Sequence, residues 1–172
     1  MALLKLENIS KAFGGNPIIE NTSFEVNPGD TIALTSPSGS GKSTMLAMAG
    51  LLMTPDSGSI IVEGGADALA FSDKQLSELH QKLLGFVFQS TQLIGSLRAT
   101  ENVIAPSNFA VGKLSFNPEE RAAELLERFG LADRMYHYPH QLSVGQKRRV
   151  AVARAMLLKP RIVIADEPTN DL

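Results

Sequence analysis

The chain has 172 residues, of which 44% are hydrophobic and 20% are charged, and its formal net charge at pH 7 is −2. This length and composition predict about one ordinary globular domain and exclude disordered and collagen-like chains. The absence of cysteine excludes a disulfide framework, a thiolate nucleophile and a thiolate zinc site, and fits a reducing compartment. The small net charge gives no reason to expect nucleic acid as a partner.

The N-terminal part of the chain shows the alternation that is typical of β-strands. Apolar and polar residues alternate over 4–9 and over 22–26, and turn-forming clusters occupy 14–17 and 27–30. This pattern predicts an antiparallel sheet with one solvent-facing side. The short apolar run 31–35 then predicts a further strand, which leads directly into a loop rich in serine and glycine.

The rest of the chain predicts helices and apolar strands in turn. Two helix starts carry capping patterns, because Ser72 has a glutamine three residues later and Asn117 precedes a proline and two glutamates. The last strand is apolar throughout, which is typical of a strand buried on both faces in a parallel, helix-covered sheet. The predicted helices cover 42–52, a segment after Ser72, 117–130 and 143–158, and the predicted strands cover 59–64, 84–88 and 162–165.

No stretch of the sequence is long and apolar enough to predict a membrane span. The longest apolar run, 45–53, has nine residues, whereas a membrane helix needs roughly 20. A membrane role would therefore have to come through a partner.

Residues 36–44, Ser-Pro-Ser-Gly-Ser-Gly-Lys-Ser-Thr, lie between a predicted strand and a predicted helix, as a phosphate-binding loop does. Glycines let backbone N–H groups surround phosphate oxygens, and the helix N-terminus adds partial positive charge. Lys42 would contact the β- and γ-phosphates, and the Ser43 hydroxyl would bind Mg²⁺. The alternative is an ordinary Gly/Ser loop before a helix. The candidate binding residues are Ser38, Gly39, Ser40, Gly41, Lys42, Ser43 and Thr44.

Ser36 stands where this loop pattern has its first glycine. If the position needs a positive φ, serine strains the loop by roughly 1 kcal/mol. We therefore expect nucleotide binding to survive but to be weaker than with glycine.

Two carboxylates, Asp166 and Glu167, directly follow the apolar run 162–165. Ligands of open α/β sheets bind at the carboxyl ends of the strands. Asp166 would support Mg²⁺, directly or through water, and Glu167 would orient or deprotonate an attacking water. The alternative is a pair of solvated loop charges, and the phosphate loop in the same chain disfavours it.

Together with three further segments, these motifs resemble the ATP-binding cassette (ABC) transporter ATPases over essentially the whole chain. Residues 142–146, Leu-Ser-Val-Gly-Gln, are similar to the family's signature motif, with Val144 where the family has glycine. Gln89 is similar to the Q-loop glutamine, and 166–172 resemble the acidic strand end and the D-loop. Within the family, 85–89 are most similar to ATPases of lipoprotein-release and macrolide-export systems.

The resemblance implies catalytic roles for Glu167, Lys42 and Gln89. It also implies that Mg²⁺ is bound by Ser43, Gln89 and Asp166. ATP and Mg²⁺ are therefore the expected cofactors.

The signature residues Ser143, Gly145 and Gln146 would meet the γ-phosphate held by a second subunit. An ordinary helix N-cap at Ser143 is the alternative. Val144 adds bulk where such a dimer closes, which would loosen closure without removing the Ser143 contact. The basic run 147–149 predicts a solvated helix face rather than a phosphate clamp.

Phe13 lies where the family places an aromatic ring that stacks on adenine. Aromatic residues at strand ends are more often part of a core, so both readings stay open.

The fold implied is an α/β P-loop NTPase with a mainly parallel core sheet, an N-terminal antiparallel β subdomain and a helical signature subdomain. We expect residues 1–172 to be a single incomplete ATPase domain, with a nucleotide-binding core over 1–88 and 159–172 and a helical subdomain over 89–158. The family continues past the D-loop with a further strand and a catalytic histidine, so we expect a C-terminally truncated chain with weak nucleotide binding.

The function implied is that of the ATP-binding and ATP-hydrolysing subunit of an ABC transporter. Its partners would be a second ATPase subunit, in a head-to-tail dimer, and transmembrane permease subunits on the inner face of the cell membrane. The alternatives are a soluble ABC-type ATP clamp and a nucleotide-binding fragment without turnover.

Overall fold

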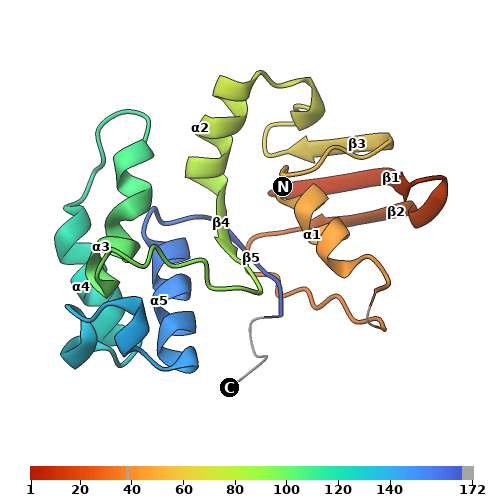
Figure 1. The fold of residues 1–172 in the computed structure, drawn as a ribbon. Helices are drawn as coiled ribbons and strands as arrows, with labels where there is room; N and C mark the ends of the chain where they lie inside the picture. Colours follow the sequence, from red (N-terminus) through yellow and green to blue (C-terminus); the bar gives the residue numbers. More distant parts are fainter. Residues whose placement is uncertain (38, 168–172) are drawn as a thin grey trace. The chain divides into compact units, whose positions relative to one another are not determined.

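The computed structural model describes residues 1–37 and 39–167 (Figure 1). The chain divides into two compact units, Met1–Leu79 and His80–Leu172. The first unit contains a three-stranded sheet and the second a two-stranded sheet with most of the helices.

The sheet of the first unit is antiparallel, with the strand order β2-β1-β3. Its strands are β1 (Leu4–Phe13), β2 (Asn16–Val26) and β3 (Ser57–Val62). They contain most of the runs that the alternation predicted, and β1 and β2 extend further, up to the tight turn between them. The antiparallel prediction is therefore confirmed. The unit also contains α1 (Lys42–Ala49) and the short 3-10 helix η1 (Ala68–Ala70).

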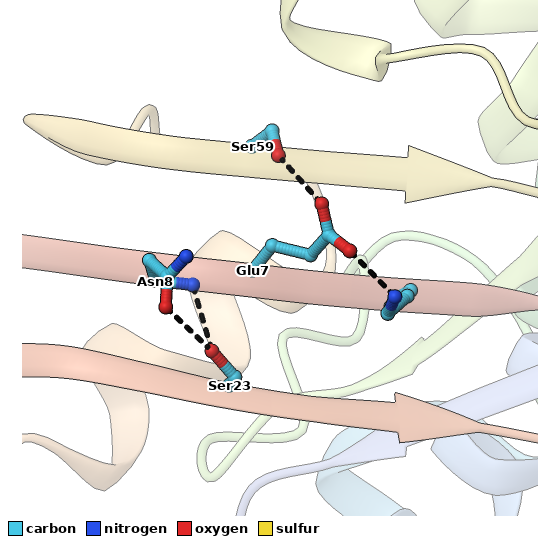
Figure 2. A network of polar contacts seen from close by, with 5 residues as sticks. Glu7, Asn8, Ser23 and Ser59 are labelled. Atoms are coloured by element: carbon cyan, nitrogen blue, oxygen red, sulfur yellow. Dashed lines mark hydrogen bonds and ion pairs between the residues drawn. The ribbon is translucent and has the colours of Figure 1, made fainter.

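The pairing of β1 with β2 shifts register between Leu6 and Ile9, around Asn8, whose φ is 51°. The Asn8 backbone N–H donates to Ser23 Oγ at 2.8 Å, and this hydroxyl donates to Asn8 Oδ1 at 3.3 Å. Next to this register shift, Ser59 Oγ donates to Glu7 Oε2 at 3.4 Å (Figure 2). Side chains therefore connect the three strands where the regular backbone ladder is interrupted.

The strand predicted over 31–35 is wrong. These residues pair with none of the other residues that the structure describes, and Ile32 is 46% exposed. A strand needs a neighbour that accepts and donates backbone hydrogen bonds, and apolar side chains alone do not supply one.

The sheet of the second unit pairs β4 (Leu84–Val87) with β5 (Ile162–Ala165) in parallel. Helix α2 (Asp73–Leu83) crosses the boundary between the units and runs directly into β4. Ser72 and Gln75 form the predicted capping box, because the Ser72 N–H donates to Gln75 Oε1 at 2.9 Å. The other helices are α3 (Ala99–Ile104), η2 (Ala105–Phe109), α4 (Pro118–Arg128), η3 (Ala132–Arg134), η4 (Pro139–Gln141) and α5 (Val144–Met156).

Helices α3, α4 and α5 share an apolar core. Asn117 caps α4 as predicted, through its side-chain oxygen and the Glu119 N–H, and Gly130 ends the helical segment with a φ of 67°. The sequence did not predict α3, because only six residues are helical and its first turn depends on distant carbonyls. The core residues are Ala99, Val103, Ala122, Leu125, Leu126, Leu131, Leu142, Val150, Ala153 and Leu157.

Burial alternates along β5. Ile162 and Ile164 are each 9% exposed, whereas Val163 between them is 46% exposed. The parallel pairing that its apolar sequence predicted is confirmed, but the burial predicted for both faces is wrong at Val163.

Gly85 lets α5 approach β4 closely. A Cβ atom at this position would overlap the Ala155 carbonyl oxygen and would lie 2.9 Å from Pro160 Cγ. The strand therefore needs a residue without a side chain here, and the approach fixes the distance between helix and strand.

We expect Gly85→Ala to lower the free energy of unfolding by about 1–3 kcal/mol, because the added methyl group overpacks this contact. Urea unfolding measures the change. Gly95→Ala is the matched control, since a Cβ atom there meets nothing within 4 Å, and it should change stability by at most about 0.5 kcal/mol. Equal losses of unfolding free energy in the two variants would contradict the close approach of α5 to β4 at Gly85.

Candidate functional site

The predicted phosphate loop leads into α1 through a left-handed glycine. Gly41 has a φ of 90°, and a Cβ atom there would lie 2.6 Å from Ile18 Cγ2 and 2.9 Å from the Ile19 Cδ1 atom. Helix α1 begins at Lys42 without a side-chain cap. No capping side chain therefore occupies the first-turn N–H groups, and these are the donors that bind phosphate at helix N-termini.

The Lys42 ammonium group lies within the loop. Its Nζ donates to the Ser36 carbonyl oxygen at 2.7 Å and to the Pro37 carbonyl oxygen at 3.0 Å. Ser40 Oγ donates to the same Pro37 oxygen at 2.8 Å and also hydrogen-bonds Ser36 Oγ. The loop is thus curled around the positive charge that a phosphate would need.

Ser36 does not carry the strain that the sequence suggested. Six non-glycine residues in the described ranges have a positive φ, and Ser36 is not one of them. The serine hydroxyl instead bonds Ser40 across the loop. Strain relief therefore gives no reason for Ser36→Gly to tighten nucleotide binding. Ser38, another predicted loop residue, lies outside the described residues.

The remaining predicted loop residues are placed at the junction of loop and helix. Gly39 has a φ of 79°, and Ser43 and Thr44 lie in the first turn of α1. Ser43 is exposed, so its hydroxyl is accessible to a ligand.

Phe13 ends β1 and is 47% exposed, so the alternative that it belongs to the core is wrong. Lys11 Nζ lies 5.8 Å from the centroid of the Phe13 ring. The same ammonium binds Asp56 Oδ1 at 2.6 Å, and Asp56 Oδ2 accepts from the Ala12 N–H at 2.8 Å. An ion pair therefore fixes the strand end that carries the exposed ring.

In the second unit, the acidic strand end and the predicted Q-loop glutamine meet. The Asp166 N–H donates to the Val87 carbonyl oxygen at 2.9 Å, which extends the parallel ladder past β5. Gln89 Nε2 then donates to Glu167 Oε2 at 2.7 Å, although the two residues are 78 positions apart. Glu167 has a φ of 46°, an uncommon conformation for a residue with a side chain. The rest of the segment compared with the D-loop, 168–172, lies outside the described residues.

The predicted signature motif forms the start of α5. Ser143 is the N-cap, its Oγ accepts from the Gln146 N–H at 3.2 Å, and its own N–H donates to Gln146 Oε1 at 2.8 Å. Gly145 lies in the first turn, and Val144 beside it is 56% exposed. The helix start is confirmed, and contact with a nucleotide stays a prediction.

The basic run after the signature is not a solvated helix face. Arg148 is 5% exposed and donates through Nη2 to the Gln89 carbonyl oxygen at 2.9 Å. Arg149 donates to the Phe129 carbonyl oxygen at 2.8 Å. Helical spacing could have predicted the burial of Arg148 from the sequence. Arg148 lies three residues before the buried Ala151 and is therefore on the inward side of α5.

The described residues contain no cluster of three or more acidic, histidine or cysteine side chains that could hold a metal ion. The predicted Mg²⁺ ligands Ser43, Gln89 and Asp166 include only one carboxylate. A hydroxyl, an amide oxygen and a carboxylate are nevertheless the hard oxygen donors that Mg²⁺ accepts, usually with substrate phosphates completing its shell.

Comparison with known proteins identifies the family. Residues 19–170 match the profile described as ABC transporter. The chain belongs to the ABC transporter family.

Relatives of this ABC protein include ATP-binding proteins of lipoprotein-releasing systems. The chain is 41% identical over 170 residues to the lipoprotein-releasing system ATP-binding protein LolD of Bacteroides thetaiotaomicron, covering 99% of this chain and 77% of that protein. It is 38% identical over 175 residues to the uncharacterized ABC transporter ATP-binding protein YknY of Bacillus subtilis, covering 99% of this chain and 75% of the relative. The resemblance to ABC transporter ATPases, including those of lipoprotein release, is confirmed.

Solved ABC cassettes share the fold. The dimeric cassette MJ0796 superimposes with a TM-score of 0.88 at 36% identity, over 98% of this chain and 75% of that one. A post-hydrolysis dimer of MJ0796 bound to ADP and Pi gives a TM-score of 0.85, also at 36% identity, over 96% of this chain and 74% of that one. The α/β P-loop fold class is therefore confirmed. Among the described residues of this ABC protein, no helix combines the length and apolarity that crossing a membrane requires.

The ion pair beside Phe13 predicts a pH-dependent contribution to the stability of the ABC protein. The hydrogen bond from Lys11, together with that from the Ala12 N–H, lowers the pKa of the Asp56 carboxyl. Such a group stabilises the fold above its unfolded pKa, and the effect is lost as the pH falls through the lower, folded pKa. Asp56→Asn should therefore lower the urea midpoint at about pH 7, by an amount that shrinks toward about pH 3.

Unfolding in urea across this pH range, with the wild type beside the variant, checks the prediction. A difference that does not change with pH would show that the Asp56 contacts are not ionic in origin.

Proposed function

We propose that this chain binds ATP with its triphosphate on the 36–44 loop and hydrolyses it at Glu167. The observation that carries the proposal is the 2.7 Å hydrogen bond from Gln89 to Glu167, directly after the parallel strands. It brings together, from distant parts of the chain, two residues that the family resemblance assigns to catalysis. The chain is accordingly the ATPase subunit of an ABC transporter.

The proposed roles follow from the chemistry of each group. Lys42 supplies positive charge to the β- and γ-phosphates, and the N–H groups at the start of α1 bind phosphate oxygens. Glu167 accepts a proton from the attacking water or orients it. Phe13 stacks on adenine through its exposed ring.

Mg²⁺ is proposed to be bound by Ser43, Gln89 and Asp166, where it would supply charge neutralisation for the phosphates. Their donor atoms are all oxygens, which fits this cation.

The subunit is proposed to work as a head-to-tail dimer, with Ser143, Gly145 and Gln146 of one copy facing the nucleotide of the other. The MJ0796 cassette is a dimer in both solved structures. The partners of the present chain are proposed to be permease subunits at the inner face of the cell membrane. The names of the LolD relatives extend the proposal to lipoproteins as the substrate of the system.

The proposed ATPase domain consists of two parts. Residues 1–88 and 159–172 form the nucleotide-binding core and 89–158 form the helical subdomain of a single ATPase domain.

Glu167→Gln should preserve MgATP binding and reduce hydrolysis by about two orders of magnitude or more, because the amide cannot take a proton from water. Phosphate release measures turnover, and fluorescence of a labelled ATP analogue measures binding. Glu63→Gln, the same substitution at a different glutamate, controls for a general effect of lost negative charge. Equal turnover in the wild type and in Glu167→Gln would refute the general-base role.

The transporter assignment predicts that the tagged chain co-purifies with integral membrane proteins from detergent-solubilised membranes, and more so when ATP is present. The soluble-clamp alternative predicts association with ribosomes or DNA instead. Mass spectrometry of the captured proteins distinguishes the two, and ribosomal proteins in stoichiometric amounts would rule out the transport reading.

A further inference from the structure

We propose that Arg148 is a positioning residue that holds Gln89 against Glu167 and so links the signature helix to the hydrolysis site. The proposal rests on the proposed function, because it takes Glu167 as the group that acts on water. It gives Arg148, in the middle of a run that sequence alone would place in solvent, a role in the reaction.

The geometry is a short relay of two hydrogen bonds. Arg148 Nη2 donates to the Gln89 main-chain oxygen at 2.9 Å, and Gln89 Nε2 donates to Glu167 Oε2 at 2.7 Å. The first bond fixes the backbone from which the Gln89 side chain extends. Because the Arg148 side chain is almost fully buried, water cannot easily replace this bond.

A second arginine of α5 holds the residues that follow Gln89. Arg154 donates to the Thr91 and Gln92 carbonyl oxygens, at 2.9 Å in each case. Gln92 has a φ of 43°, an uncommon conformation for a residue with a side chain, and its carbonyl is one of the two that Arg154 binds. Two side chains of one helix therefore hold three carbonyls between residues 89 and 92, and this segment moves with α5.

The far end of the same loop is fixed to α3. Asn102 is fully buried, accepts from the Ile94 N–H at 2.8 Å and donates to the carbonyl oxygens of Ile94, Leu97 and Arg98 at 2.9–3.1 Å. The loop after Gln89 is consequently held at both ends, and α5 determines where its first residue lies.

Helix α5 begins with the predicted signature residue Ser143 at its N-cap. Arg148 follows five residues later, about 7.5 Å along the helix axis at the usual rise. A shift or tilt of α5 when phosphate reaches its N-terminus therefore moves the Gln89 backbone directly. The rigid helix converts an event at the signature into a change in the position of Gln89 relative to Glu167.

The test compares Arg148→Met with Arg149→Met in the full chain. Both substitutions remove a guanidinium that bonds a carbonyl, but the partner of Arg149 is Phe129, away from Gln89. We expect Arg148→Met to lower kcat by about tenfold or more with ATP affinity changed by less than about threefold, because a misplaced group costs rate rather than binding. Arg149→Met should lower the unfolding midpoint with kcat unchanged.

A second readout does not depend on turnover. The side-chain amide signals of Gln89 in an NMR spectrum, assigned by their loss in Gln89→Glu, should shift in Arg148→Met and keep their position in Arg149→Met. Arg148→Lys retains a donor and should recover part of the activity, and it serves as the folded variant if Arg148→Met does not fold.

The outcomes separate the two proposals. Absence of hydrolysis in the wild type would remove the proposed function, whereas the Gln89 signals would still report on the Arg148 contact. Equal effects of the two methionine variants on kcat, or Gln89 signals unchanged in the Arg148 variants, would overturn the positioning role.

Discussion

Parallel pairing of β4 with β5 is the constraint on which the candidate hydrolysis site depends. Because both strands run in the same direction, the residues that follow them emerge at one edge of the sheet. The bond from the Asp166 N–H to Val87 carries the pairing just beyond β5, and Gln89 and Glu167 meet there. Gly85 allows α5 to pack close to this pair of strands, so the helix that carries the signature also supports the reactive edge.

Local signals predicted the parts of the fold that depend on local physics. The Asn117 cap, the helix end at Gly130 and the Ser72 capping box act within a few residues, and the structure contains all three. The predicted strand over 31–35 failed because strand formation depends on a partner elsewhere in the chain. Helix α3 was missed for the same reason, since the Ala99 and Thr100 N–H groups donate to carbonyls of 135–137.

The candidate site could be predicted as a set of residues but not as a set of contacts. Lys42, Gln89 and Glu167 were recognised from motifs, yet the bond between the last two is visible only in three dimensions. Arg148 shows the limit most clearly, because charge in a sequence favours a solvent-exposed assignment, whereas the fold buries this guanidinium on a main-chain oxygen. Every residue has a main-chain carbonyl, so the sequence does not show which carbonyl accepts a hydrogen bond from a side chain.

The contact between Gly41 and the β-hairpin limits how the phosphate loop can change in evolution. A side chain at position 41 would meet Ile18 and would also require an L-residue at a φ of 90°, so two independent barriers protect the glycine. A smaller residue at position 18 would leave Ile19 Cδ1 2.9 Å from the added Cβ atom, and it would leave the φ unchanged. Variation in β2 therefore cannot open position 41 to a larger residue, because the backbone conformation by itself favours glycine there.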